Sequence, residues 1–357
     1  MTDDVRIGLL GVGRIGLAHA EALRRLPGVA HVVLADADSE RARAAAARLG
    51  AAALPVDEVF GAVDGLVIAT PTPSHADLLE RAVAAGLPAF CEKPVALDVA
   101  TTRRVVAAVQ AGAVPVQIGF QRRFDAGYRA CREAVARGDL GELRRAHLVT
   151  CDPSPPPAEF IAGSGGLFAD CGIHDVDALR WVSGHEVVEV SASGANRGAA
   201  FFGEAGDVDE AVGWLRLDDD TLATLQLSRY NGAGYDVRLE VAGTLGTRVA
   251  GLDAHSALVS AEPGVAFPAG VPHAGFSPRF EAAYAAELAA FVEVVAHRLP
   301  SPAPVGDALE ALYVCVALER SRRQGRPVRV DEVRSAPDPS IDVGSVAGAS
   351  GRQDATP

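Results

Sequence analysis

The chain has 357 residues, enough for two domains, and its composition is that of a soluble globular protein. The formal net charge is −13 and no Lys/Arg stripe alternates with aromatic residues, which argues against nucleic acid as the main partner. The five cysteines are scattered, and no segment has the pattern of a signal peptide or a membrane span, so we expect a cytoplasmic protein with reduced thiols.

The first elements form a strand, a glycine turn and a helix. The apolar run 5–10 leads into the GxGxxG sequence at 11–16, after which apolar residues recur at helical spacing. The glycines allow a tight turn, close approach of the backbone to a pyrophosphate, and close packing of helix on strand, while free N–H groups at the helix start favour phosphates. This pattern predicts a dinucleotide-binding unit.

A second apolar run, 29–35, ends in Asp36. A carboxylate at this place hydrogen-bonds the adenosine ribose of NAD and repels the extra phosphate of NADP. Arg41 and Arg43 still leave NADP as a less favoured cofactor. The alternative interpretation is that Asp36 is an exposed residue that caps the helix from Ser39.

The alternation of strands and helices continues to residue 119. We expect strands at 65–69, 88–91 and 115–119, and helices at 74–85 and 98–110. This order predicts a parallel, doubly wound sheet, in which ligands bind beyond the carboxyl ends of the strands. The predicted crevice is then lined by Thr70-Pro71-Thr72, Glu92-Lys93-Pro94 and Gln121-Arg122, and Lys93-Pro94 is a candidate cis peptide.

Lys93 is the only lysine among the 33 Lys and Arg residues. A buried ammonium can lose its proton at a tunable pKa, whereas a guanidinium cannot. Lys93 is therefore a candidate for proton transfer or for holding a reacting oxygen, and the alternative is an ordinary surface lysine.

The second half of the chain has a different pattern. A helix at 125–137 and a strand at 143–151 precede a proline-rich loop, and strands near 210–217, 222–228 and 237–241 with short turns predict an antiparallel sheet. Its open face is expected to cover the crevice or to pair with another subunit. Helices at 278–298 and 307–324 follow, and residues from Ser335 onward have the composition of a disordered tail.

The predicted fold class is thus α/β, with an N-terminal Rossmann doubly wound parallel sheet and a C-terminal α+β domain that has a mostly antiparallel open sheet. The predicted boundaries are 1–123 for the NAD(P)-binding domain, 124–330 for the substrate and oligomerisation domain, and 331–357 for the tail.

Asp170 and His174 are four residues apart before an apolar helix, so a helical course places them on one face. A carboxylate there can fix the imidazole tautomer and stabilise its protonated form, which suits His174 to accept a proton. One alternative is a structural histidine at a helix end. Another is a metal site that adds Cys171 and Asp175, although the spacing is not typical of zinc and we expect no metal.

Together these motifs resemble the Gfo/Idh/MocA oxidoreductases, and within them the inositol 2-dehydrogenases, over residues 5 to about 330. The resemblance rests on the sequences at 11–16, 92–94, 119–125, 170–175, 235–236, 240–244 and 279–287. It implies an NAD(P)-dependent dehydrogenase that oxidises a secondary ring hydroxyl of a cyclitol. The implied catalytic residues are Lys93, Asp170 and His174, with His174 as general base oriented by Asp170 and Lys93 bonded to the same substrate oxygen.

The residues expected to contact ligands form two sets. For the cofactor they are Gly11, Gly13, Arg14, Ile15, Gly16, Asp36, Ala37, Thr70, Pro71, Thr72, His75, Glu92, Lys93 and Gln121. For a small polyol or cyclitol substrate, the resemblance implies Lys93, Arg122, Asp152, His174, Tyr235 and Tyr284. It also implies a homo-oligomer, a dimer or tetramer. The alternatives are an aldose or aminosugar dehydrogenase, a sugar-processing enzyme with tightly bound NAD, and a non-catalytic NAD-binding sensor.

Overall fold

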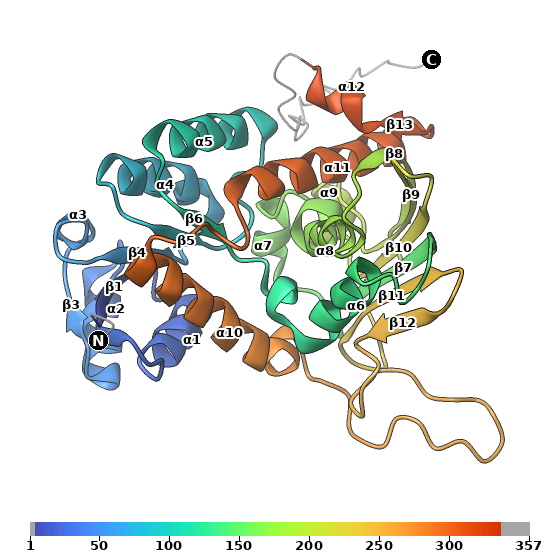
Figure 1. Ribbon diagram of the computed structural model, residues 1–357, viewed down its shortest axis with the longest axis horizontal. Helices are drawn as coiled ribbons and strands as arrows, with labels where there is room; N and C mark the ends of the chain where they lie inside the picture. The colour runs from blue at the N-terminus through green and yellow to red at the C-terminus, as the bar shows by residue number, and fades with distance from the viewer. Residues whose placement is uncertain (1–3, 337–357) are drawn as a thin grey trace, which may run out of the picture.

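The computed structural model describes residues 4–336 and contains two sheets side by side, each with its own helices (Figure 1). The first sheet is six-stranded in the order β3-β2-β1-β4-β5-β6, and all of its pairs are parallel. Its strands are β1 (Val5–Leu10), β2 (Val29–Ala35), β3 (Ala52–Ala53), β4 (Gly65–Ile68), β5 (Ala89–Cys91) and β6 (Val116–Ile118). The predicted doubly wound parallel sheet is confirmed.

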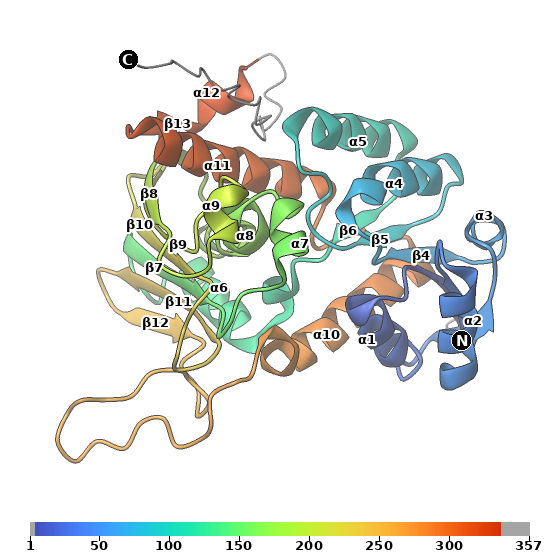
Figure 2. The ribbon, with the colours of Figure 1, turned by 180° about the vertical axis from the view of Figure 1, so that it is seen from behind.

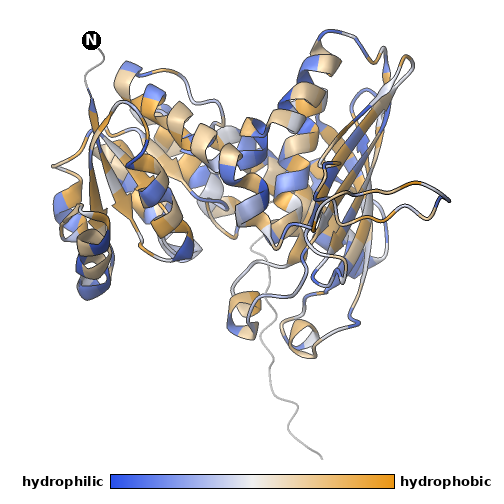
Figure 3. Cartoon of the chain, turned by 90° about the horizontal axis from the view of Figure 1, so that it is seen from below, coloured by the Kyte–Doolittle hydropathy of each residue, from blue (hydrophilic) through white to orange (hydrophobic). Residues whose placement is uncertain are grey.

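Helices cover both faces of this sheet because its strands are apolar on both sides (Figure 3). One face carries α1 (Arg14–Leu23) and α2 (Ser39–Leu49), and the other carries α4 (His75–Ala84) and α5 (Val99–Gly112). Asp38 caps α2, accepting hydrogen bonds from the backbone N–H groups of Glu40 and Arg41 at 3.0 and 3.1 Å. Asp36 is therefore not the cap, and that alternative interpretation is wrong. The short helices α3 (Val56–Val59), η1 (Thr72–Ser74) and η2 (Gln121–Phe124) connect these elements.

The second sheet is seven-stranded in the order β12-β11-β7-β10-β9-β8-β13. It is antiparallel except for β7 and β10, which run parallel with Cys151 opposite Ser228. The strands are β7 (Leu143–Cys151), β8 (Val187–Ala195), β9 (Glu210–Leu217), β10 (Leu222–Ser228), β11 (Asp236–Gly243), β12 (Thr247–Ala250) and β13 (Val328–Arg329). The predicted mostly antiparallel sheet is confirmed, and the parallel pair within it becomes important at the site.

Helices α6 (Ala126–Ala136), α8 (Ile173–Ser183) and α11 (Val305–Gln324) lie between the two sheets (Figures 1 and 2). The open face of the second sheet therefore points away from the first sheet and does not cover the predicted crevice. It exposes Val212, Trp214 and Leu222. The expected pairing of this face with another subunit stays a prediction. Short helices α7 (Ala158–Ala162), η3 (Phe168–Gly172) and α9 (Phe201–Glu204) were not predicted.

Helix α10 (Phe276–His297) crosses back to the first sheet, although the sequence placed it in the second domain (Figure 1). Leu288, Phe291 and Val295 belong to the same buried cluster as β1, β2 and α1. The contact is close, because a Cβ on Gly65 would lie 2.5 Å from Cγ2 of Val295. The helix therefore ties the second half of the chain to the core of the dinucleotide-binding unit.

The chain remains regular beyond the end predicted for it. Helix α12 (Val330–Arg334) follows β13, and Glu332 accepts a hydrogen bond from the backbone N–H of Arg329 at 2.9 Å. The predicted start of the tail at residue 331 is therefore too early. The sequence has no long apolar pattern here, and the local capping bond stabilises the helical turn without one. Residues 337–357 of the predicted tail lie outside the described residues. No helix within 4–336 is long and apolar enough to cross a membrane.

Candidate active site

The glycine turn between β1 and α1 has the shape that a pyrophosphate requires. Gly11 has φ of +93°, and a Cβ there would lie 2.7 Å from the backbone oxygen of Ala69. A Cβ on Gly16 would lie 1.8 Å from the backbone oxygen of Gly11, whereas one on Gly13 would meet nothing within 4 Å. No side chain caps the start of α1, so its N–H groups remain available to phosphate oxygens. The turn therefore fits a dinucleotide.

Arg14 and Ile15 begin α1 beside this turn. Asp36 ends β2 and accepts a hydrogen bond from the backbone N–H of Val12 at 2.9 Å. Its other oxygen accepts from the backbone N–H of Asp38, also at 2.9 Å. The carboxylate thus holds the glycine turn against the end of β2, and Ala37 follows it where a ribose is expected. Arg41 lies 3.5 Å from the Asp36 carboxylate.

The loop after β4 is braced by a buried histidine. The ring nitrogens of His75 lie 2.8 Å from the backbone oxygens of Thr70 and Pro94. Both nitrogens are thus engaged, and His75 braces the Thr70-Pro71-Thr72 loop against Pro94. The Lys93-Pro94 peptide is cis, as the sequence suggested.

Glu92 and Gln121 point into the interior near the end of β5. Nε2 of the buried His19 lies 2.6 Å from Oε1 of Glu92. Burial raises the pKa of Glu92, but the hydrogen bond and charge of His19 and the Lys93 ammonium outweigh it and lower that pKa. Gln121 is buried, and its Oε1 has no hydrogen-bond partner among the described residues.

The single lysine is held as a cation. Lys93 Nζ donates to Oδ1 of Asp170 at 2.9 Å and to the backbone oxygen of Asp170 at 2.8 Å. Burial lowers the pKa of Lys93, but the Asp170 carboxylate outweighs burial and raises the pKa above its usual value. The structure therefore favours Lys93 as a hydrogen-bond donor to a reacting oxygen over Lys93 as a group that exchanges its own proton.

Asp170 has a second cationic partner that the sequence analysis missed. Arg229 directly follows β10, and its Nη2 donates to Oδ2 of Asp170 at 2.7 Å. Burial raises the pKa of Asp170, but Lys93 and Arg229 outweigh it and hold that pKa well below its usual value. A signal existed in the sequence, because Arg229 stands at the end of a predicted strand, as Asp152 does. The sequence did not predict that β7 and β10 are parallel neighbours, so it did not bring Arg229 next to Asp152.

The expectation that Asp170 orients His174 is wrong in this structure. Both carboxylate oxygens of Asp170 bond cations, and Nδ1 of His174 is buried without a partner among the described residues. The physical reason is local: Asp170 lies in the π-helical turn η3, whereas His174 lies in α8, so the predicted α-helical face is interrupted. Burial, then the charges of Lys93 and Arg122, lower the pKa of His174 well below its usual value. His174 is thus neutral near pH 7 and able to accept a proton.

Arg122 is buried, and its guanidinium is already paired. Its Nη1 donates to Oδ1 of Asp175 at 2.5 Å, and its Nη2 donates to Oγ1 of Thr150 at 2.8 Å. Next to it, Arg123 donates to both oxygens of Asp177. These two pairs fasten η2 to α8, so Arg122 helps to position the site from inside. Because Asp170 and Asp175 pair with Lys93 and Arg122, the cluster is built from ion pairs and not from free metal ligands.

The remaining predicted substrate residues surround the same region. Asp152 follows β7, and its Oδ2 accepts from Nη1 of Arg229 at 3.1 Å. Tyr235 and Tyr284 are largely enclosed, and burial raises both of their pKa values well above the usual value. The charges of Asp152 and Arg122 act on Tyr235, and those of Glu92 and Arg122 act on Tyr284, so both hydroxyls lie near the ion pairs.

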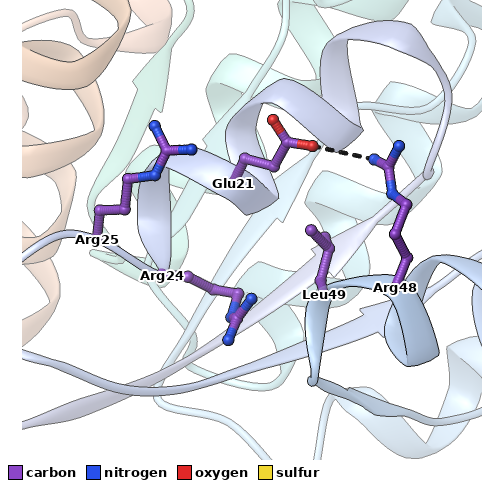
Figure 4. Close-up of a pocket in the computed structure, with 5 residues that line it drawn as sticks. All are labelled: Glu21, Arg24, Arg25, Arg48 and Leu49. Carbon is purple, nitrogen blue, oxygen red and sulfur yellow. Dashed lines mark hydrogen bonds and ion pairs between the residues drawn. The ribbon is translucent and has the colours of Figure 1, made fainter.

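A separate surface pocket of about 460 Å³ lies at the far end of α1 (Figure 4). Its lining is Glu21, Arg24, Arg25, Arg48 and Leu49. The glycine turn precedes the start of α1, whereas this pocket adjoins the end of α1 and the end of α2. None of the predicted site residues lines it, so the pocket is not the cofactor crevice.

Comparisons with known proteins agree with this arrangement. The profile "Oxidoreductase family, NAD-binding Rossmann fold" matches residues 5–120, and "GFO/IDH/MocA C-terminal domain" matches residues 128–249. A myo-inositol dehydrogenase of Streptomyces leeuwenhoekii is 36% identical over 324 residues, which cover 89% of this chain and 98% of that protein.

Two solved structures have the same fold. A myo-inositol dehydrogenase from Corynebacterium glutamicum has a TM-score of 0.84 at 36% identity, covering 91% of this chain and 98% of that chain. A scyllo-inositol dehydrogenase from Lactobacillus casei, with bound NAD(H) and scyllo-inositol, has a TM-score of 0.83 at 27% identity, covering 92% of this chain and 99% of that chain.

The glycine turn and the enclosed polar cluster beside it define an NAD-binding oxidoreductase. The chain belongs to the Gfo/Idh/MocA oxidoreductase family and is related to the inositol dehydrogenases.

Proposed function

We propose that the protein oxidises a secondary ring hydroxyl of a cyclitol resembling myo-inositol to the ketone, with NAD as the hydride acceptor. One observation carries the proposal: the only lysine is held as a cation by Asp170, and its charge acts on the half-buried, neutral imidazole of His174. Such a pair supplies a hydrogen-bond donor and a proton acceptor to one oxygen. The similarity to inositol dehydrogenases over most of the chain supports the substrate class.

The cofactor is held by the glycine turn and Asp36, and when bound it accepts the hydride from the ring carbon. In this proposal the same crevice is lined by Arg14, Ile15, Thr70, Pro71, Thr72 and Glu92. The Asp36 carboxylate repels a ribose phosphate, which favours NAD over NADP. NADP stays an alternative, less favoured cofactor, because the guanidinium of Arg41 lies 3.5 Å from Asp36 and can pair with that phosphate.

His174 accepts the hydroxyl proton in this proposal. Its Nδ1 is fully buried, so the proton arrives at Nε2. Lys93 Nζ donates a hydrogen bond to the same oxygen and offsets the negative charge that grows there as the C–H bond breaks. The lowered pKa of His174 keeps the imidazole unprotonated near pH 7, although it also makes the imidazole a weaker base, and the raised pKa of Lys93 keeps its ammonium charged.

The other ring hydroxyls are read by polar groups around this pair. We assign this role to Asp152, Tyr235 and Tyr284, whose oxygen atoms accept or donate hydrogen bonds to a polyol. Arg122 supports them through Asp175 and Thr150 instead of meeting the ring directly. A site built to bond hydroxyls rejects analogues that lack them, because its buried polar groups are then left unpaired.

The test is NADH formation by the purified protein with free NAD. The panel contains myo-, scyllo- and chiro-inositol, aminocyclitols and common aldoses. Preference for one inositol isomer over every aldose supports the proposal. Preference for an aldose or aminosugar supports the alternative sugar dehydrogenase. Absence of turnover while NAD still binds contradicts both, and favours either a sugar-processing enzyme with tightly bound NAD or an NAD-binding sensor.

A further inference from the structure

The guanidinium of Arg229 is a buried group that none of the roles above uses. Its side chain is 3% exposed and makes three polar contacts. Nη2 donates to Oδ2 of Asp170 at 2.7 Å, while Nη1 lies 3.1 Å from Oδ2 of Asp152 and 3.0 Å from Sγ of Cys171. A buried guanidinium with two carboxylate partners holds both in fixed orientations.

The parallel strand pair explains why these groups meet. Cys151 is opposite Ser228 in the register of β7 and β10, so the next residues, Asp152 and Arg229, leave the sheet side by side. Asp170 approaches from the π-helical turn η3, which contacts β10. The backbone thus delivers Arg229 between two carboxylates that are far apart in the sequence.

The result is a row of alternating charge: Lys93, Asp170, Arg229 and Asp152. Asp170 uses Oδ1 for Lys93 and Oδ2 for Arg229, so neither end of its carboxylate is free to turn. If one partner is removed, the carboxylate can rotate about its last side-chain bond, which has a broad torsional preference. Lys93 Nζ also donates to the backbone oxygen of Asp170, and that bond does not involve the carboxylate. The second bond, which fixes the direction of the ammonium, therefore depends on Arg229, although the two cations do not touch.

We propose that Arg229 is a positioning residue that couples recognition of a ring hydroxyl at Asp152 to the placement of Lys93. The inference rests on the proposed function. A ring hydroxyl that hydrogen-bonds Asp152 fixes that carboxylate, and the contacts through Arg229 and Asp170 then fix Lys93. A polyol that carries this second hydroxyl next to the reacting one is therefore oxidised faster than a polyol that lacks it. Arg229 thereby contributes to turnover as well as to binding.

The test compares Arg229→Met, Arg229→Lys and Arg180→Met with the wild type. Arg180 is the matched control, because it is buried and paired with Glu186 at 2.6 Å but lies outside the site. The measurements are kcat, KM, the Kd for NAD, the melting temperature, and the pH profile of kcat/KM.

For Arg229→Met we expect kcat/KM to fall about 100-fold, the effect of a small misplacement of catalytic groups, with the Kd for NAD nearly unchanged. His174 sets the acid limb in the wild type; in the variant the ionisation of Asp170 adds to it and moves it to higher pH, because Asp170 loses a cation that lowers its pKa and must stay ionised to hold Lys93. Arg229→Lys keeps the charge but cannot reach both carboxylates, so it restores much of kcat and leaves KM raised. Arg180→Met lowers the melting temperature and leaves the pH profile unchanged.

A wild-type pH profile in Arg229→Met, with a loss of activity no larger than in Arg180→Met, would overturn the inference. If the wild type oxidises no cyclitol or sugar, the proposed function fails first, and a crystal structure of Arg229→Met decides about Arg229. A broken contact between Lys93 Nζ and Oδ1 of Asp170 then supports the positioning role. An intact contact overturns it.

Discussion

The cofactor side and the proposed substrate side of the site use different chemical groups. On the cofactor side, backbone groups do the binding: the glycine turn shapes the crevice, and the uncapped start of α1 offers N–H groups. On the proposed substrate side, paired charged side chains take this role, with Asp170 held between Lys93 and Arg229. We therefore expect substitutions to act through shape on the first side and through charge and proton position on the second.

The largest expected effect is on the substrate side, at Lys93. Lys93→Arg keeps the positive charge but replaces a compact ammonium with a planar fork that does not fit the same oxygen. We expect turnover to fall by roughly 10²- to 10⁴-fold, the usual contribution of a positioned group at the reacting proton. The Kd for NAD, measured by fluorescence titration, should change little. Near wild-type turnover in this variant would remove Lys93 from the proposed chemistry.

On the cofactor side, substitutions of two glycines distinguish an effect on folding stability from an effect on NAD binding. Gly16→Ala forces a Cβ against the backbone oxygen of Gly11, so we expect it to lower stability by about 1–3 kcal/mol and to weaken NAD binding. Gly13→Ala meets no protein atom, so it should leave the melting temperature unchanged and weaken NAD binding by about 10-fold through lost access to the pyrophosphate.

Thermal melts with and without NAD measure both variants. If Gly13→Ala binds NAD as the wild type does, the second glycine does not face the cofactor. If it also melts early, the crevice is tighter than the structure shows.

The pH profile sharpens the comparison, because only the substrate side relies on proton position. Burial, Lys93 and Arg122 lower the pKa of His174, so the acid limb of kcat/KM for alcohol oxidation should lie below pH 6.5, the value of a free histidine. Low pH also lowers the free energy of unfolding. As the pH falls below 6.5, His174 takes up a proton in the unfolded chain but not in the folded chain. The free energy of unfolding therefore falls until the pH reaches the lowered pKa of folded His174.

Removing the imidazole tests this assignment. His174→Gln should make the free energy of unfolding less sensitive to pH in that window, as thermal melts between about pH 5 and about pH 8 would show. Equal sensitivity in the wild type and His174→Gln would contradict a buried neutral imidazole.

The smallest effect is expected at Asp36. Asp36→Ala removes the charge that repels the NADP phosphate and leaves Arg41 nearby, so the preference for NAD over NADP should narrow by about 10-fold. The ratio of kcat/KM for the two cofactors measures it. Asp38→Ala is the control, because it removes the cap of α2 and the other carboxylate near Arg41 but leaves Asp36 in place. An unchanged ratio in Asp36→Ala would place cofactor selection elsewhere.

The two sides also differ in how far the sequence predicts them. The cofactor side is local: a strand, a turn and a helix within 5–23 carry their own geometry, so the fold and the glycine roles follow from spacing. The substrate side depends on contacts across the chain, with Lys93 bonded 77 residues away to Asp170 and Arg229 bonded 59 residues away to the same carboxylate. Residue types suggested Lys93 and His174, but no local pattern encodes which charges pair.

The errors have physical causes of the same kind. The π-helical turn at Phe168–Gly172 interrupts the predicted α-helical face, so the predicted contact between Asp170 and His174 does not form. β7 and β10 form a parallel pair inside an otherwise antiparallel sheet. The sequence did not predict this pair, and so the role of Arg229 was missed. The sequence also did not predict that Arg122 pairs with Asp175.

The central claim is net oxidation of a ring hydroxyl with release of reduced cofactor. The most direct measurement is the amount of NADH formed per protein molecule when the preferred inositol isomer and free NAD are both in excess. Our account predicts many equivalents per site, and their loss in His174→Ala. At most one equivalent per site, with nucleotide retained on the purified protein, would contradict it and indicate a tightly bound cofactor that is oxidised and reduced within each cycle.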